Sequence, residues 1–244
     1  MPKVFVLSIG DLDDPPENRL HPVAIRSEDG SLTLVDAGMP EMLPLIRHAL
    51  EAQGLRLEDV RRLVITHGDL DHMGGAAELV EATGAEVIAH ERELPFVTGA
   101  EILRHAPTPE DIAKMPPQMR EMMLSLPPER LASINRRPVP LEVNRVVKGG
   151  DEVVPGVEVI ETPGHTPGHV SLWIPSEATL VTGDAVNTRG GRVNLPPAHF
   201  TPDMASAKSS IQALAAFPAT RLISYHGGEI AGDQAEALRA LAGA

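Results

Sequence analysis

A run of seven residues, Thr-His-Gly-Asp-Leu-Asp-His at 66–72, concentrates imidazoles and carboxylates directly after the apolar stretch 63–65. Its four ionisable members are His67, Asp69, Asp71 and His72. Burying unpaired charges of this kind is costly unless something compensates them. A bound cation is the simplest compensation, so the run predicts a metal site.

Three later segments also place polar side chains just after an expected strand or turn. His165 and His169 lie in the run 162–169, Thr-Pro-Gly-His-Thr-Pro-Gly-His, where glycines beside each histidine keep the backbone compact. Asp184 and His226 each follow an apolar strand. These residues are further candidate ligands. For His169, however, a role in orienting its neighbours and plain packing both remain open.

The elements that must position these residues alternate between strand-like and helix-like patterns. Strands are expected at 4–9, 23–27, 32–36, 60–66, 85–90, 153–154, 157–161, 170–174, 179–182 and 221–225. Helices are expected at 41–53, 73–83, 118–126, 202–217 and 233–242. The first cluster would then lie between the carboxyl end of a strand and the amino end of a helix, in a layered α/β fold.

One segment interrupts this pattern. Residues 95–140 are rich in proline and methionine, which favours a helical insertion or lid within a single domain spanning 1–244. The segment either covers the domain or supplies an apolar substrate pocket, since flexible thioethers suit adaptable surfaces. The candidate lining residues are Phe96, Met115, Met119, Met122 and Met123.

The overall composition limits the partners. Lys plus Arg number 21 and Asp plus Glu 34, which gives a net charge of −13 and argues against a nucleic-acid partner. There is no cysteine, so a metal must be held by nitrogen and oxygen. We expect a cytoplasmic protein, because no apolar run is long enough to span a membrane and the first residues lack a signal-peptide pattern.

Taken in order, these motifs resemble those of the metallo-β-lactamase superfamily. The first histidine and aspartate run, the segment 162–169, Asp184 and His226 follow its series of metal motifs, and Val35-Asp36-Ala37-Gly38 is similar to its usual strand and turn. The resemblance implies an α/β fold of four layers, an αβ/βα sandwich. It also implies two divalent metal ions at the edge of the sheets.

The resemblance further implies a role for each matching residue. The ligands of one metal would be His67, Asp69 and His165. The ligands of the other would be Asp71, His72 and His226, and Asp184 would bridge the two. A metal-bound hydroxide would be the nucleophile. Asp71 and Asp184 are therefore expected to serve catalysis as well as metal binding.

Asp69 departs from the pattern, which has histidine at this position. Either it binds metal directly, or it orients a ligand imidazole. As a ligand it adds negative charge, and this makes manganese or iron acceptable beside the expected zinc. A glutamate occupies this position in the flavodiiron branch of the superfamily, so the resemblance also allows a redox centre.

The expected function is metal-dependent hydrolysis of a small ester, lactone or thioester. The short chain and its methionine-rich insertion favour a small-molecule substrate. The alternatives are a di-iron oxidoreductase of the same fold and a phosphodiesterase. Arg136, Arg137 and Arg145 are the basic residues considered for binding glutathione carboxylates. A homodimer formed through the insertion is also compatible with the sequence.

Overall fold

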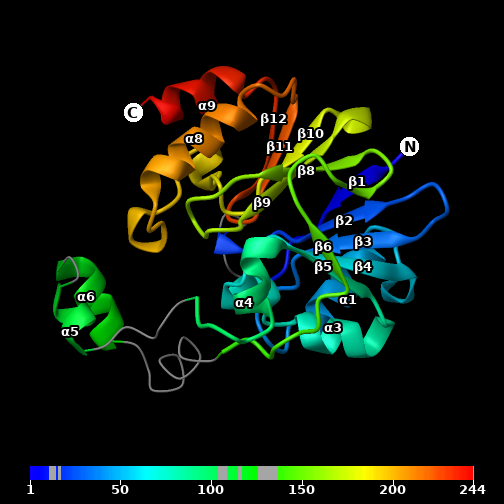
Figure 1. The fold of residues 1–244 in the computed structure, drawn as a ribbon, viewed down its shortest axis with the longest axis horizontal. Coiled ribbons are helices and arrows are strands. Elements are labelled where there is room, and N and C mark those ends of the chain that lie inside the picture. The colour runs from blue at the N-terminus through cyan, green and yellow to red at the C-terminus, as the bar shows by residue number, and fades with distance from the viewer. Residues whose placement is uncertain (11–14, 16–17, 104–108, 115–116, 126–136, 244) are drawn as a thin grey trace.

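Two six-stranded β-sheets lie face to face and carry helices on their outer sides (Figure 1). The structure is a computed structural model that describes residues 1–10, 15, 18–103, 109–114, 117–125 and 137–243. The first half of the chain builds one sheet and the second half builds the other. The arrangement confirms the four-layer αβ/βα sandwich.

The first sheet has the strand order β1-β2-β3-β4-β5-β6. The strands are β1 Lys3–Val6, β2 Val23–Arg26, β3 Leu32–Val35, β4 Val60–Ile65, β5 Glu86–His90 and β6 Arg145–Val147. The β1, β2 and β3 strands pair antiparallel, whereas β3 through β6 pair parallel. Parallel pairing brings the carboxyl ends of β3, β4 and β5 to the same edge.

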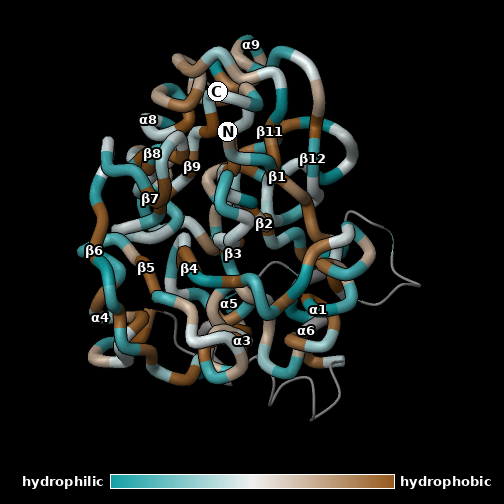
Figure 2. Tube along the Cα trace, turned by 90° about the vertical axis from the view of Figure 1, so that its right-hand side faces the viewer, coloured by the Kyte–Doolittle hydropathy of each residue, from teal (hydrophilic) through white to brown (hydrophobic). Residues whose placement is uncertain are grey.

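The second sheet has the order β12-β11-β10-β9-β8-β7. The strands are β7 Glu152–Val154, β8 Val157–Glu161, β9 Val170–Ile174, β10 Thr179–Val181, β11 Arg221–Ser224 and β12 Gly228–Ala231. Only β10 and β11 pair parallel, so their carboxyl ends also share an edge. Figure 2 shows hydrophobic stretches along strands of this sheet, such as β7 and β11.

Helices cover both outer faces. The α-helices are α1 Leu43–Ala52, α2 Leu70–Met73, α3 Ala76–Thr83, α4 Leu94–Val97, α5 Pro109–Lys114, α6 Pro117–Ser125, α8 Met204–Leu214 and α9 Ala235–Ala242. Short 3-10 turns are η2 Leu57–Asp59, η3 Glu91–Glu93, η4 Pro175–Glu177, η5 Arg189–Gly191 and η6 Ala198–Phe200. Among the described helices, none is long and apolar enough to cross a bilayer.

Three hydrophobic clusters hold the four layers together. The first packs α1 and α3 against the outer face of the first sheet, with Ile46 and Leu79 fully buried. The second fills the space between the sheets, where Val64 of β4 meets residues such as Leu172 of β9. The third packs α8 and α9 on the second sheet. Successive side chains of a strand point to opposite faces of its sheet, so one strand can contribute to two of these clusters.

Most predicted elements are present, with some changes at their ends. The β8 and β9 strands have the predicted bounds, and most other strands are shorter. The predicted helix 73–83 is wrong at its start, because the helix is interrupted at Gly74 and Gly75, between α2 and α3. A Cβ on either glycine would lie 2.4 Å from a backbone oxygen, so only glycine fits at this bend. Several short elements were not predicted, among them α2, α4, α5, β6 and β12.

The 95–140 segment contains α4 at its start, then α5 and α6, which lie apart from the sandwich in Figure 1. Of the proposed pocket-lining residues, Phe96 is partly buried beside Gly68. Met115 and the side chains of Met119, Met122 and Met123 lie outside the described residues. The single-domain assignment and the role of this segment as a lid remain predictions.

Candidate metal centre

The loop after β4 supplies the first cluster. The strand ends at Ile65, and α2 begins at Leu70, so His67 and Asp69 precede this helix while Asp71 and His72 lie within it. The Thr66 backbone N–H and hydroxyl donate to the two carboxylate oxygens of Asp36, over 2.9 and 2.7 Å. Asp36 thus fixes the start of the loop.

The second contribution comes from the loop between β8 and β9. Gly164 has a φ of +135°, and a Cβ there would lie 2.3 Å from the backbone nitrogen of Ala207 in α8. The loop therefore packs tightly on this helix only because glycine occupies the position. The close packing directs His165 toward the first cluster.

The remaining two residues follow parallel strands. Asp184 comes after β10 and His226 after β11, so both lie at the same edge of the second sheet. The Asp184 N–H donates to Nε2 of His169 over 3.0 Å. The centre forms where the carboxyl ends of β4, β10 and β11 meet.

The structure brings all seven predicted ligands together. Oδ2 of Asp69 lies 3.3 Å from Nε2 of His67 and 3.2 Å from Nε2 of His165. Nε2 of His226 lies 3.2 Å from Oδ2 of Asp71, on the His72 side of the centre.

Asp184 lies between these two groups. Its Oδ1 is 3.4 Å from Nε2 of His72, and its Oδ2 is 3.6 Å from Nε2 of His165 and 3.4 Å from Nε2 of His226. One ligand atom each from His67, His165 and Asp184 fit within 4.8 Å of one another, as do those of the Asp71, His72 and His226 set.

The donor chemistry fits divalent cations. Nε2 of His67, Nε2 of His72 and Oδ1 of Asp184 are buried and have no hydrogen-bond partner within the described part of the chain. Unsatisfied buried polar atoms are rare, because each costs free energy on folding. Imidazole and carboxylate donors around a common point would be satisfied by metal ions.

Hydrogen bonds on the far sides of the rings select the tautomers. Oδ2 of Asp36 lies 2.8 Å from Nδ1 of His72, and the Thr66 hydroxyl lies 3.1 Å from Nδ1 of His67. The Thr66 hydroxyl already donates to Asp36, so its oxygen must accept from His67. When these rings are neutral, as metal binding requires, Nδ1 of each therefore carries the proton and the Nε2 lone pair faces the centre.

His165 follows the same rule. The Thr201 hydroxyl donates to the Pro197 carbonyl and lies 3.5 Å from Nδ1 of His165, so it accepts from this ring. Sequence reasoning did not identify Asp36, Thr66 or Thr201 as supports of the imidazoles. The Asp36 carboxylate directly after a buried strand was the one available signal, whereas the hydroxyl contacts depend on tertiary packing.

His169 supports Asp184 and does not face the centre as a ligand. Since its Nε2 accepts the Asp184 N–H, its proton is on Nδ1, which lies 2.8 Å from the Thr162 hydroxyl. Burial, reinforced by the neighbouring His67, keeps the pKa of His169 well below its usual value. A neutral ring is what this backbone contact requires. The His199 ring lies beside that of Phe200, with centroids 4.1 Å apart and the ring planes tilted by 51°.

Tyr225 is a further support that lies under the centre. Its hydroxyl donates to the backbone carbonyl of Asp71 over 2.6 Å, and its ring lies on that of His72 with centroids 3.9 Å apart. The side chain is buried. Tyr225 therefore ties β11 to α2, which joins the two sheets at the site.

Comparison with known proteins agrees with this geometry. The sequence pattern of the metallo-beta-lactamase superfamily matches residues 22–226, which is most of the chain. The chain belongs to the metallo-β-lactamase superfamily. Its membership makes it a metallo-hydrolase of the αβ/βα type, and members of this superfamily bind divalent metals.

Three relatives show the range of the similarity. The probable metallo-hydrolase YflN of Bacillus subtilis (strain 168) is 31% identical over 84% of this chain and 78% of its own length. A hydroxyacylglutathione hydrolase of Fuscovulum blasticum is 31% identical over 80% of this chain and 56% of its own length. An N-acyl homoserine lactonase of Bacillus thuringiensis is 27% identical over 78% of this chain and 72% of its own length.

Solved structures share the fold. Metallo-beta-lactamase family protein TTHA1429 from Thermus thermophilus aligns with a TM-score of 0.67 and 23% identity, over 97% of this chain and 78% of that one. The protein TTHA1623, solved in a di-iron-bound form, aligns with a TM-score of 0.61 and 26% identity, over 93% of this chain and 94% of that one.

The carboxylates of the centre set the charge of its imidazoles. Burial opposes the protonation of His226, but Asp184 and Asp71 outweigh it and raise the pKa of His226 to about 9. Burial also opposes protonation of His72, whose pKa Asp184, Asp36 and Asp71 nevertheless raise well above its usual value. Burial, with His72 nearby, lowers the pKa of His67.

Metal uptake by the metal-free protein should therefore release protons at about pH 7.5, because protonated His226 must lose its proton to coordinate. The pKa of His226 is raised, so proton competition from this ring is strongest at low pH and disappears as the pH rises past about 9. Calorimetric titration of zinc in two buffers of different ionisation enthalpy measures the release. Uptake without proton release, at an affinity independent of pH below 9, would contradict this assignment.

Proposed function

We propose that this chain is a dinuclear metal-dependent hydrolase of small esters, lactones or thioesters. The observation that carries the proposal is the convergence of seven imidazole and carboxylate side chains, three of which bury donor atoms without a hydrogen-bond partner in the described structure. Such an arrangement is costly without cations, and family membership supplies the hydrolytic chemistry.

Each metal would have its own ligands and share one. The first would be held by His67, Asp69 and His165, and the second by Asp71, His72 and His226. Asp184 would bridge them, since its two oxygens face both groups. Two divalent ions would supply Lewis acidity, which activates water and polarises a scissile carbonyl.

Exposure indicates from which side the substrate approaches. The Asp71 side chain is 33% exposed and that of His226 is 20% exposed, while Asp69 and Asp184 are each 12% exposed. Asp71 and His226 of the second ligand group therefore lie nearest the opening, while His72 is fully buried. Asp71 faces the incoming substrate, and Tyr225 holds its backbone in place. Asp184 lies deeper, fixed by His169.

Within this substrate class we propose a lactone or simple ester rather than a glutathione thioester, because Arg145 is engaged elsewhere. Arg145, one of the basic residues considered for glutathione carboxylates, is committed to Glu86 and to the backbone carbonyl of Val153. Arg136 lies outside the described residues. The similarity to an N-acyl homoserine lactonase, over most of both chains, supports the same substrate class.

Asp69 makes the donor sets of the two metals alike. With aspartate instead of histidine at this position, each group has two imidazoles and one carboxylate of its own, plus a share in Asp184. Three carboxylates and one hydroxide then balance the charge of two divalent ions, which leaves a less electrophilic centre. Harder ions such as manganese or iron bind such oxygen-richer sites well, beside zinc.

Replacement of Asp69 tests its place in the ligand set. We expect Asp69→Ala to lose about one metal per chain and to lower kcat/KM at least 100-fold, roughly the effect of losing a positioned catalytic component. Metal content by mass spectrometry and initial rates measure both. Asp233→Ala, which changes an exposed aspartate at the start of α9, is the control. Unchanged metal content and rate in Asp69→Ala would remove Asp69 from the centre.

Substrate class is tested by a direct comparison. The metal-loaded protein should hydrolyse lactones, esters or thioesters with kcat/KM at least about 100-fold above that for phosphodiesters and β-lactams, because specificity reflects differential transition-state binding. The same panel assayed with Asp184→Ala corrects for reactions that do not use the centre. A preference for phosphodiesters would replace the proposal with a phosphodiesterase.

A di-iron oxidoreductase is the second candidate, motivated by Asp69 and by the similarity to a protein solved in a di-iron-bound form. Protein produced in iron-supplemented medium distinguishes the two. Bound zinc or manganese without redox-linked absorbance would exclude the oxidoreductase, whereas bound iron with such absorbance would support it.

A further inference from the structure

Glu93 is a fully buried carboxylate outside the predicted ligand set. It ends the 3-10 turn η3, just after β5. Its Oε2 accepts the Gly68 N–H over 2.9 Å, and its Oε1 accepts the Gly168 N–H over 2.8 Å and the Thr166 hydroxyl over 2.6 Å. Three donors satisfy a group that would otherwise be costly to bury.

These three hydrogen bonds join the two loops that supply the first ligand group. Gly68 lies between His67 and Asp69, whereas Thr166 directly follows His165. The loops are about a hundred residues apart in sequence and come from different sheets. Within the described structure, the hydrogen bonds of Glu93 go to this side of the centre, whereas His72 of the second ligand group contacts Asp36 and the backbone of Asp71 accepts from Tyr225.

The backbone around Glu93 is built for close contact with both loops. A Cβ on Gly168 would lie 2.8 Å from the Glu93 nitrogen, and one on Gly68 would lie 2.8 Å from Cβ of Phe96 in α4. Both loops therefore press directly on the η3–α4 segment, which fixes their separation. Glycine at both positions permits this approach.

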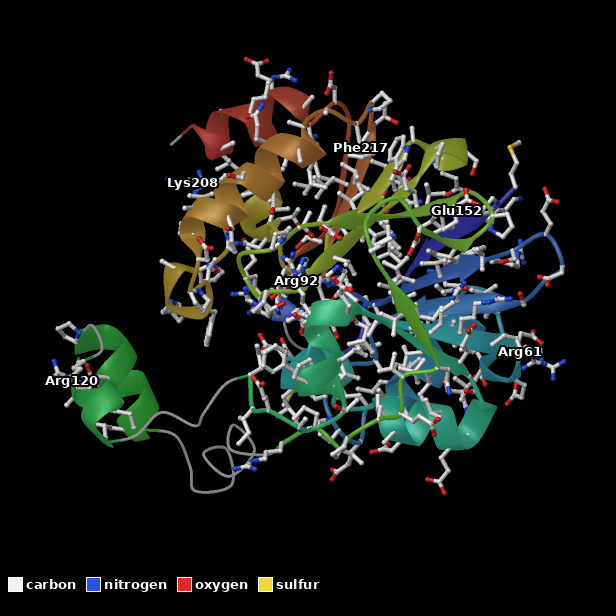
Figure 3. All side chains as sticks on the ribbon, viewed as in Figure 1. Arg61, Arg92, Arg120, Glu152, Lys208 and Phe217 are labelled. Carbon is white, nitrogen blue, oxygen red and sulfur yellow. The ribbon has the colours of Figure 1, made fainter. Side chains whose placement is uncertain are left out.

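The turn that carries Glu93 is itself anchored. Nδ1 of His90 accepts the Arg92 N–H over 3.1 Å, which caps η3, and Nε2 of the same ring lies 3.2 Å from Oε1 of Glu161 in β8. His90 is buried. Figure 3 labels Arg92 beside α4, where the two halves of the molecule meet. The contact from β5 to β8 holds Glu93 in place against both sheets.

We propose that Glu93 is a positioning residue for the first metal, which sets the spacing of His67, Asp69 and His165 by clamping their two loops. This inference rests on the ligand set given under the proposed function. A carboxylate suits the role because both of its oxygens accept hydrogen bonds. An amide has one oxygen and one NH2 group. In Glu93→Gln, the NH2 group would therefore point at an N–H or hydroxyl donor of one of the two loops, and that hydrogen bond would be lost.

The consequence is selective. Loss of a group that orients metal ligands weakens binding by about 10- to 100-fold. We expect Glu93→Gln to lower the affinity for the first metal by this factor and the affinity for the second metal by less than about twofold. A residue that served only general stability would weaken both groups equally. Thr166→Val removes one of the three donors and should give a smaller loss in the same direction.

The test is a titration of metal-free protein with zinc, with the stoichiometry and both affinities measured by calorimetry and mass spectrometry. Two backgrounds identify the affected metal. The His226→Ala background disables the second ligand group, so only the first metal binds. Adding Glu93→Gln to this background should lower the affinity for that metal. The His67→Ala background disables the first ligand group. Adding Glu93→Gln to it should change the affinity for the second metal little. Glu152→Gln, which replaces an exposed carboxylate that also accepts a glycine N–H, is the matched control and should bind two metals normally.

Each result has a distinct meaning. Equal weakening of both metals in Glu93→Gln and Thr166→Val, or no weakening of either, would overturn the role of Glu93 while leaving the ligand set intact. If Glu93→Gln does not fold, Thr166→Val gives the same comparison. Failure of the wild-type chain to bind a metal through His67, Asp69 and His165 would overturn the proposed ligand set and the clamp together.

Discussion

The compensation of buried charge is the constraint on which the rest of this structure depends. Three carboxylates and four imidazoles converge in a space of a few ångströms, and several of their atoms have been removed from water. An interior of low dielectric constant does not tolerate such a set without opposite charge. Two divalent cations would neutralise the carboxylates and satisfy the orphaned nitrogens at once.

The fold serves this constraint by bringing strand ends to one place. The carboxyl ends of β4, β10 and β11 meet at a shared edge of the sandwich, and short loops there carry the ligands. Loops are precise only when the surrounding structure holds them. Asp36 and Tyr225 hold the second ligand group, while Glu93 clamps the loops of the first.

The sequence was most informative where a pattern is local. The β8 and β9 strands were predicted with their observed bounds, because alternating apolar residues bounded by glycine and proline define a strand by themselves. Helix 73–83 was placed too early, since the break at Gly74 and Gly75 depends on their packing against another segment. The β6 strand, three residues long, carries too little pattern to identify.

The same distinction applies to the centre. Its seven predicted residues do come together, because their motifs are specific in type and order. Their roles as metal ligands remain predictions. Asp36 was not recognised as a support although it directly follows a buried strand, and nothing local distinguishes Glu93, which accepts three hydrogen bonds, from a carboxylate on the surface. Only the tertiary structure reveals which donors surround each of them.

The most direct test of the two-metal centre is an anomalous difference map from crystals of the metal-loaded protein. The proposed ligand set predicts two peaks on either side of Asp184, with Asp69, His67 and His165 about 2.0–2.2 Å from one and Asp71, His72 and His226 at similar distances from the other. A single peak, or two peaks with Asp69 turned away from both, would contradict it.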